Sequence, residues 1–392
     1  MGRFELLVGS SEFWTRARQD IARAQGRVLV QAMTFEGDAA GTKVAQAIDA
    51  SGARDRRVLV DDYTRHVLND TFLLFSHDRA LAAEARATWD MFDELQRNGV
   101  QVRVTNPIGR NPLRYVARNH KKLLVMDDVA WLGGINFSDH NFSWHDMMLR
   151  IDDAEVADWL SRQFDQDWYG KPAFARRGFG PELEIESFDG ATNVANAGKL
   201  LSHFAEATRS IEVLSAYPTM PFTHAMAHAA RRGVEVTIHT PRPNNKPIVR
   251  DYLLGFAAKA GIRLRLVDLM THVKAALIDG ETLLAGSSNF DFVSYRRNSE
   301  YVAVLRDPAL IAEVEARLLA PARSEGTAPL AEDLRGWAPI RAAATLKAAD
   351  LALRHVPVGP RIEEWVRPRR DEQREEQSAM GAEMVGDSGG NP

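Results

Sequence analysis

The chain has 392 residues, 45% hydrophobic and 26% charged, which is enough for two globular domains of moderate size and a tail. Its net charge of −4 weighs against a protein that binds nucleic acid, although local basic patches remain compatible with this balance. The absence of cysteine excludes disulfides, thiolate nucleophiles and cysteine-bound zinc.

No apolar run approaches the roughly 18 residues that cross a bilayer. The N-terminus lacks a secretory signal, and Leu6 stands where a myristoylation site has Ser or Thr. We therefore expect a cytoplasmic protein, either free or peripheral on the inner face of the cell membrane.

Strand and helix patterns alternate through the first part of the chain. Short β-branched runs predict the strands, and apolar residues at helical spacing predict the helices. In order, the predicted elements are a strand at 27–35, a helix at 41–52, a strand at 56–63, a helix at 88–99 and a strand at 101–105. This alternation predicts an α/β domain with a largely parallel core sheet.

The same order begins again near residue 182, with a strand at 211–219, a helix at 222–233, a strand at 234–240, and a helix and a strand within 256–268. This internal duplication predicts two similar α/β domains, 1–175 and 182–325, with a boundary near 178–187. In the remainder, 326–392, we expect a helix at 337–356 that docks onto the domains, and then a disordered tail.

The first copy carries two insertions that the second copy lacks, at 63–88 and 105–119. The second insertion gathers three cationic side chains and one aromatic one: Arg110, Arg114, Tyr115 and Arg118. It is either a solvated basic loop or a cationic rim for an anionic ligand.

Each half contains one copy of the motif H-x-K-x4-D, formed by His120, Lys122 and Asp127 and by His272, Lys274 and Asp279. GGIN (133–136) and GSSN (286–289) follow, and beyond them stand the carboxylates Asp146 and Glu300. A chance match to the motif is expected roughly 0.02 times in a chain of this composition. Two matches at equivalent places in a repeat therefore indicate function.

The motif residues have the chemistry that cleaves a phosphodiester. Alternate residues of a strand share a face, so each histidine points the same way as its lysine, and a pseudo-twofold axis would bring both pairs together. Lys122, Lys274, Asn136 and Asn289 can then hold the phosphate oxygens. A neutral imidazole attacks phosphorus, and a protonated one donates to the leaving alkoxide. No metal is required, because the lysines supply positive charge.

The acidic residues have two different expected roles. Asp146 and Glu300 are candidates to hold the second ring nitrogen of each histidine. Asp127 and Asp279 follow apolar strands, and they either belong to the site or form turns and ion pairs that organise it. We interpret the other nine histidines, including His140 and His145, as ordinary structural residues.

The doubled motif with G-G/S-x-N resembles the phospholipase D superfamily over about residues 4–322. Within it, RNHKKLLVMDD, AARRGVEV, GSSNFDF and RRNSEYV are most similar to the bacterial cardiolipin synthases. The resemblance implies two pseudo-twofold-related α/β/α sandwich domains with the active site at their interface. It adds Ser287 to the phosphate-binding and supporting residues, implies a phosphohistidine intermediate, and assigns His120 as nucleophile and His272 as general acid. No cofactor is implied.

The resemblance favours transfer of a phosphatidyl group between two phosphatidylglycerol molecules to give cardiolipin. A phospholipase D that uses water is the alternative, because hydrolysis and transfer share every residue named. A phosphodiesterase acting on nucleic acid and a non-catalytic lipid-binding scaffold are less favoured, so no nucleic-acid partner is expected. Peripheral membrane contact would use the apolar FLLF (72–75) of the first insertion together with the arginine-rich loop.

Overall fold

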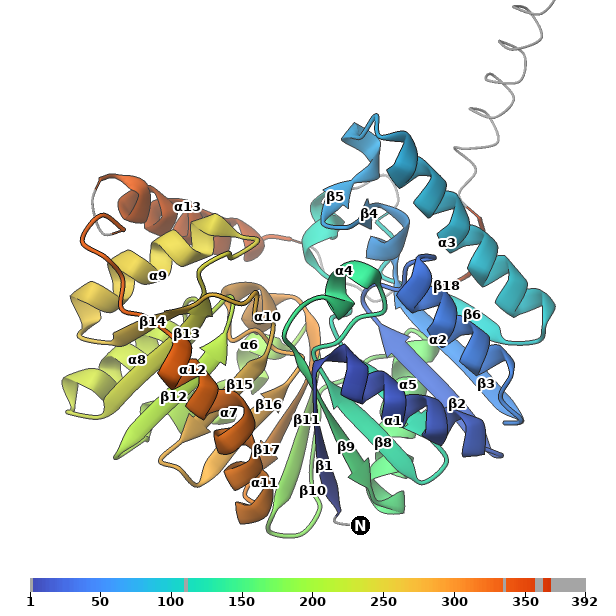
Figure 1. The fold of residues 1–392 in the computed structure, drawn as a ribbon, viewed down its shortest axis with the longest axis horizontal. Helices are drawn as coiled ribbons and strands as arrows, with labels where there is room; N and C mark the ends of the chain where they lie inside the picture. Colours follow the sequence, from blue (N-terminus) through green and yellow to red (C-terminus); the bar gives the residue numbers. More distant parts are fainter. Residues whose placement is uncertain (1–2, 109–111, 334–335, 357–361, 368–392) are drawn as a thin grey trace, which may run out of the picture.

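The computed structural model describes residues 3–108, 112–333, 336–356 and 362–367 (Figure 1). Two eight-stranded sheets form its framework. The strands of the first sheet are β1 (Phe4–Val8), β2 (Arg27–Ala32), β3 (Asp55–Asp61), β6 (Gln101–Thr105), β7 (Leu123–Met126), β8 (Val129–Gly133), β9 (Met147–Asp152) and β18 (Ile362–Glu364). Those of the second are β10 (Ala175–Gly178), β11 (Leu183–Asp189), β12 (Ser210–Ser215), β13 (Glu235–Pro241), β14 (Arg263–Val267), β15 (Lys274–Ile278), β16 (Thr282–Gly286) and β17 (Ser299–Leu305).

The strand orders of the two sheets repeat each other. The first sheet runs β1-β9-β8-β7-β2-β3-β6, with β18 at its edge, and the second runs β11-β17-β16-β15-β12-β13-β14, with β10 at its edge. In the first sheet β8 pairs antiparallel with β7 and β9, and in the second sheet β16 pairs in the same way with β15 and β17. The predicted duplication is therefore present in the topology.

The prediction of a largely parallel core sheet is wrong, because both sheets are mixed. β2, β3 and β6 are parallel, whereas β7, β8, β9 and β1 pair antiparallel. Asp127 and Asp128 alone join β7 to β8, and so short a connection links only antiparallel strands. The second sheet has the same pattern, with β12, β13 and β14 parallel.

Helices cover the outer face of each sheet and also fill the space between the sheets. On the outer face of the first sheet lie α1 (Gly9–Arg23), α2 (Ala39–Asp49) and α3 (Arg79–Arg97). On that of the second lie α7 (Gly198–Ala205), α8 (Phe222–Arg231) and α9 (Pro247–Ala260), with α13 (Ala338–Leu353) against α9. The inner helices are α5 (Ala154–Trp168), α11 (Pro308–Val314) and α12 (Ala320–Glu325), with the π-helical turn Glu315–Leu319 between the last two.

One apolar core joins the two halves. Leu160 of α5 and Val314 of α11 are fully buried in a cluster that includes Val125 from the first sheet and Leu277 and Ala303 from the second. Because both sheets bury side chains in the same cluster, the core fixes the orientation of one half relative to the other.

The remaining elements are short and lie mainly in connections. They are the 3₁₀ turns η1 (Asp62–Arg65), η2 (Leu73–Phe75) and η3 (Pro112–Val116), the hairpin strands β4 (Val67–Leu68) and β5 (Thr71–Phe72), and the helices α4 (Asp139–Phe142), α6 (Asn193–Asn196) and α10 (Phe292–Arg296). The 63–88 insertion forms η1, the β4–β5 hairpin, η2 and the beginning of α3. The predicted helix at 88–99 therefore begins earlier, at Arg79.

The C-terminal segment contacts both halves. Ala342, Leu346 and Leu353 of α13 are buried against the second half, whereas β18 pairs with β6 of the first sheet. The predicted tail from 368 onward lies outside the described residues. Among the helices that the structure describes, none has the length and apolar character needed to cross a bilayer.

Candidate active site

The two motifs meet where the halves contact each other, and backbone hydrogen bonds fix them there. The N–H of His120 donates to the carbonyl of Ser299 at 2.9 Å, and the N–H of His272 donates to that of His145 at 2.7 Å. Each acceptor directly precedes the carboxylate residue that was predicted to orient a histidine. Each motif is thus held beside the carboxylate segment of the other half, as pseudo-twofold symmetry requires.

The histidine–carboxylate pairs cross between the halves. His120 Nδ1 lies 3.1 Å from Glu300 Oε2, and His272 Nδ1 lies 2.7 Å from Asp146 Oδ2. All four side chains are buried, and the two carboxylate residues are at most 2% exposed. An ionised carboxylate only accepts hydrogen bonds, so the ring proton of each histidine lies on Nδ1 and the lone pair lies on Nε2. Both imidazoles therefore have the tautomer of a nucleophile or base.

The two carboxylates are supported differently. The Ser287 hydroxyl donates to Glu300, and the Ser294 hydroxyl donates to Glu300 Oε1 at 2.7 Å. In the first half Gly134 occupies the position of Ser287, and a Cβ atom there would clash with the carboxylate of Asp146. The shorter aspartate thus requires a glycine, whereas the longer glutamate binds a serine. Ser287 supports a carboxylate and does not line the pocket.

Both motif lysines are buried beside the histidines. Lys122 Nζ donates to the carbonyl of His120 at 2.8 Å, and Lys274 Nζ donates to that of His272. Burial lowers the pKa of both ammonium groups, and that of Lys274 falls to about 8 despite the nearby carboxylates of Asp146 and Glu300. An ammonium has three N–H donors, so each lysine keeps donors for a phosphate.

The buried charges set the protonation states of the two pairs. Burial lowers the pKa of His120 to about 4, although Glu300 acts in the opposite direction. Burial and the two lysines hold the pKa of His272 well below its usual value. Burial raises the pKa of Asp146 to about 6. Burial also acts to raise the pKa of Glu300, but the effects of His120 and Lys122 outweigh it and lower that pKa. At neutral pH both imidazoles are neutral and both carboxylates are ionised.

A single pocket contains the two histidines and both predicted asparagines. Its lining comprises Met33, Thr34, Glu36, Tyr63, Asp70, His120, Asn136, His140, Asn141, Trp144, Tyr217, Asn245, Lys246, His272 and Asn289. Asn136 is anchored, because its Oδ1 accepts from the Thr34 N–H at 3.3 Å. Asn289 Oδ1 is buried without a hydrogen-bond partner among the described residues. A buried amide without its partner is a group that a ligand can satisfy.

Most of the pocket residues were not predicted as part of the site, and four of them lie around His272 and Asn136 or carry a charge into the pocket. The ring centroid of Trp144 lies 4.9 Å from that of His272, and that of Tyr217 lies 5.9 Å from it. Lys246 Nζ lies 4.5 Å from the Tyr217 centroid. His140 lines the pocket as well, contrary to its interpretation as an ordinary structural histidine. Its position four residues after Asn136 was the available signal, whereas a lone tryptophan, tyrosine or lysine has no spacing that marks it.

Asp127 and Asp279 lie outside the pocket lining, each at the turn that follows its motif strand. The Asp127 carboxylate accepts from the backbone N–H groups of residues 25–27 at 2.8 Å. The Asp279 carboxylate accepts from those of residues 208–210 at 2.7 to 2.9 Å. Both residues have a positive φ, +49° and +54°. Of the two expected roles for Asp127 and Asp279, these contacts favour the formation of turns over a place in the site.

Arg118 fits neither expectation for the second insertion, a solvated basic loop or a cationic rim. Its side chain is 4% exposed and donates to Asp61 at 2.8 Å, so it pairs internally because a buried guanidinium needs a carboxylate. Arg110 lies outside the described residues. Tyr115 packs 5.7 Å from the Tyr63 ring, so this insertion supports a wall of the pocket.

Comparison with known proteins places these features in one family. A family model described as "Cardiolipin synthase, PLD-like domain" matches residues 17–168 and 200–320. Cardiolipin synthase 1 of Staphylococcus epidermidis is 26% identical over 336 residues, which cover 78% of this chain and 64% of that protein. The match thus spans less than two thirds of that relative. Cardiolipin synthase B of Salmonella typhi is 26% identical over 338 residues, covering 78% of this chain and 76% of that protein.

The fold is also found in a solved structure. The crystal structure of phosphatidylserine synthase from Haemophilus influenzae Rd KW20 superposes with a TM-score of 0.69 at 17% identity. The superposition covers 91% of this chain and 95% of that one. At this identity the similarity shows a common fold, and the expected pair of related α/β halves is confirmed.

Proposed function

The chain belongs to the "Cardiolipin synthase, PLD-like domain" family and is an enzyme of the phospholipase D superfamily, and from this premise we propose that it transfers phosphatidyl groups between phospholipids. The proposed donor and acceptor are both phosphatidylglycerol, and the products are cardiolipin and glycerol. The names of the relatives support this choice of substrate. We further propose that the enzyme acts as a peripheral protein on the inner face of the cell membrane.

The observation that carries the proposal is the pair of crossed histidine–carboxylate contacts around one pocket. Phosphatidyl transfer through a covalent intermediate needs one nucleophile and one acid–base group on opposite sides of the phosphorus. His120 and His272 meet this need from the two halves. Lys122 and Lys274 supply the positive charge that a transferred phosphoryl group requires.

In the proposed first step, His120 Nε2 attacks the phosphorus of the donor. A phosphorus–nitrogen bond forms, the bond to the glycerol oxygen breaks, and protonated His272 gives its proton to that oxygen. Binding of the anionic phosphodiester favours the protonated imidazole, because it adds a negative charge beside a site rich in lysine. Glu300 stabilises the positive charge that develops on His120.

In the second step, the acceptor hydroxyl gives its proton to neutral His272 and attacks the phosphohistidine. The new phosphorus–oxygen bond forms while the phosphorus–nitrogen bond breaks, and His120 is regenerated. Water in place of the acceptor would yield phosphatidic acid through the same residues.

Lipid contact is proposed for the first insertion. Leu74 is 66% exposed and Phe72 is 38% exposed. The Phe72 ring lies 4.8 Å from Tyr115, which packs against the pocket residue Tyr63. Exposed apolar side chains connected to the pocket wall are suited to enter the surface of a bilayer.

The test is incubation with phosphatidylglycerol as sole lipid, followed by mass spectrometry of the products and trapping of an acid-labile phosphohistidine. Cardiolipin and glycerol in equal amounts support transfer, and their absence from the His120→Ala reaction shows that their formation depends on His120. Phosphatidic acid without cardiolipin would replace transfer by hydrolysis. Salt-sensitive cleavage of plasmid DNA, with no lipid product, would reject the proposal.

A further inference from the structure

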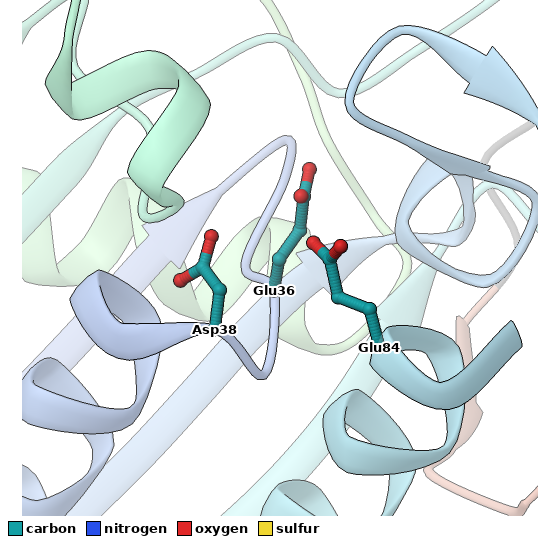
Figure 2. Close-up of side chains that lie close together, drawn as sticks. All are labelled: Glu36, Asp38 and Glu84. Carbon is teal, nitrogen blue, oxygen red and sulfur yellow. The ribbon is translucent and has the colours of Figure 1, made fainter. Parts of the chain in front are cut away.

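Three carboxylates converge at the wall of the pocket. Glu36 and Asp38 lie in the loop between β2 and α2, and Glu84 lies on α3 (Figure 2). One oxygen atom from each carboxylate lies within 4.8 Å of the other two. Figure 2 shows the carboxyl group of Glu84 directed toward that of Glu36. Three elements separated in the sequence thus bring negative charge to one place.

Glu36 has an unsatisfied oxygen. The residue is 2% exposed, and its Oε2 has no hydrogen-bond partner among the described residues. Burial and the negative charges of Glu84 and Asp38 raise the pKa of its carboxyl group to about 9. Without a cation this carboxyl group is therefore protonated at neutral pH, and a bound cation would offset the cost of burying its ionised form beside two like charges.

The other two carboxylates are held in position by groups that leave lone pairs unused. Asp38 accepts from the N–H of Gly41 at 2.9 Å as the cap of α2, and Glu84 accepts from Asn69 Nδ2 at 3.0 Å. Each ionised carboxylate has about four acceptor positions. The ligand atoms are therefore oriented before a ligand arrives.

The second half has no corresponding acid. The N–H of Glu36 donates to the Phe137 carbonyl, and the equivalent bond in the second half runs from Thr219 to Phe290. The Thr219 hydroxyl accepts from the N–H of Phe292 at 3.0 Å, so it is satisfied. Glu84 belongs to the insertion that the second half lacks. The cluster is thus a feature added to one half of the repeat.

We propose that Glu36, Asp38 and Glu84 bind one divalent cation of the calcium or magnesium class. A ligand set made of carboxylate oxygens suits such hard cations, and water completes the coordination. Because Glu36 lines the pocket and Glu84 belongs to the insertion, the cation fastens the inserted helix to the pocket wall. The phosphatidyl transfer proposed above does not use this ion, so the two proposals are tested separately.

Calorimetric titration of the full chain, first freed of metal with EDTA and desalted, tests the site with calcium chloride and with magnesium chloride. We expect saturable binding of one ion per chain and a rise in Tm when the ion is added. Glu84→Gln should weaken binding by about tenfold to a hundredfold, as expected when a coordinating group is lost. Glu94→Gln is the matched control, because this exposed residue of the same helix carries the same charge.

Measurement of Tm without metal separates ligand loss from misfolding. Glu36→Gln replaces a carboxyl group that is protonated at neutral pH without metal by a neutral amide of the same shape, so its metal-free Tm should stay close to that of the unsubstituted protein, while its response to the ion is lost. The proposal is overturned if neither ion gives saturable binding, if Glu84→Gln binds as tightly as the unsubstituted protein, or if Glu94→Gln loses as much affinity as Glu84→Gln. A metal-free Tm of Glu36→Gln that falls would also overturn it, because the carboxylate would then stabilise the fold without a cation.

Discussion

Nδ1 of His120 in the first half is hydrogen-bonded to Oε2 of Glu300 in the second half at 3.1 Å. The reciprocal bond from His272 to Asp146 crosses in the other direction. Neither half therefore contains a complete histidine–carboxylate pair. Each half supplies the carboxylate that orients the histidine of the other half, so the contact between the halves is part of the site. The shared core that fixes the two sheets therefore also sets the positions of the two histidine–carboxylate pairs.

Replacement of Glu300 by glutamine should lower kcat by about 10²- to 10⁴-fold, because an amide does not stabilise the charge that develops on His120. Steady-state production of cardiolipin from phosphatidylglycerol measures the effect. The double variant with His120→Ala should be no slower than His120→Ala alone, since both residues act as one unit. Multiplicative losses in the double variant would show that Glu300 acts apart from His120.

The pH dependence of kcat/KM should be bell-shaped. Asp146 has a pKa of about 6, so it becomes protonated as the pH falls below that value and no longer accepts from His272. Lys274 has a pKa of about 8, so it loses its charge as the pH rises above that value. Activity should therefore decline on both sides of this interval, with the profile reporting the free enzyme.

Two substitutions assign the limbs of this profile. Asp146→Asn should remove the acidic limb and lower the plateau, because the amide does not titrate. Lys274→Arg should move the alkaline limb upward, because a guanidinium stays charged across the measured range. An unchanged alkaline limb in Lys274→Arg would assign that limb to another group.

Short-range patterns indicated the centre of the candidate site but few of the residues that line the pocket. The repeat of H-x-K with its downstream asparagine and carboxylate indicated both histidines, both lysines, Asn136 and Asn289, because the same residue types recur at equivalent places in the two halves. The exchange of carboxylates was not predictable, since Asp146 is nearer in sequence to His120 than to its partner His272. The mixed sheet was missed because the parallel and antiparallel strands are equally apolar.

The pocket wall was harder to predict than its centre. Lys246 and Asp70 come from connections whose lengths differ between the halves, so the repeat did not indicate them. Arg118 was misassigned because sequence shows a charge but not its buried partner, Asp61. A local sequence pattern does not predict contacts between residues that are far apart in the chain.

Asp279→Ala should reduce stability far more than catalysis. Its carboxylate accepts from three consecutive backbone N–H groups, and loss of such an anchor costs about 1–2 kcal/mol of the free energy of unfolding. Urea unfolding measures this cost, and kcat/KM measured well below the unfolding transition should stay within about threefold of the unsubstituted value. Asp127→Ala provides the equivalent test in the first half. A loss of activity comparable to that of His120→Ala, in a folded protein, would place these aspartates in the chemistry.

Leu74→Ser should weaken binding to phosphatidylglycerol vesicles by about tenfold to a hundredfold, because burial of one leucine side chain in an apolar environment contributes about 1.5–3 kcal/mol. Co-sedimentation measures the binding, and turnover of a short-chain soluble phosphatidylglycerol should not change. Leu330→Ser is the control, since Leu330 is 56% exposed on another part of the chain. Equal effects of the two substitutions would remove the first insertion from the membrane-contacting surface.

Lys246 should favour anionic over zwitterionic lipids. Its ammonium lines the pocket 4.5 Å from the Tyr217 ring and belongs to neither motif, so its charge is available to a head group. Lys246→Met should lower kcat/KM for phosphatidylglycerol by about tenfold, which corresponds to the loss of one charge–charge interaction of about 1.4 kcal/mol, and should leave phosphatidylcholine turnover nearly unchanged. Lys259→Met, an exposed position of α9, removes the same charge away from the pocket and should have no effect on this ratio. Parallel losses for both lipids in Lys246→Met would assign the lysine to the common phosphate instead of the head group.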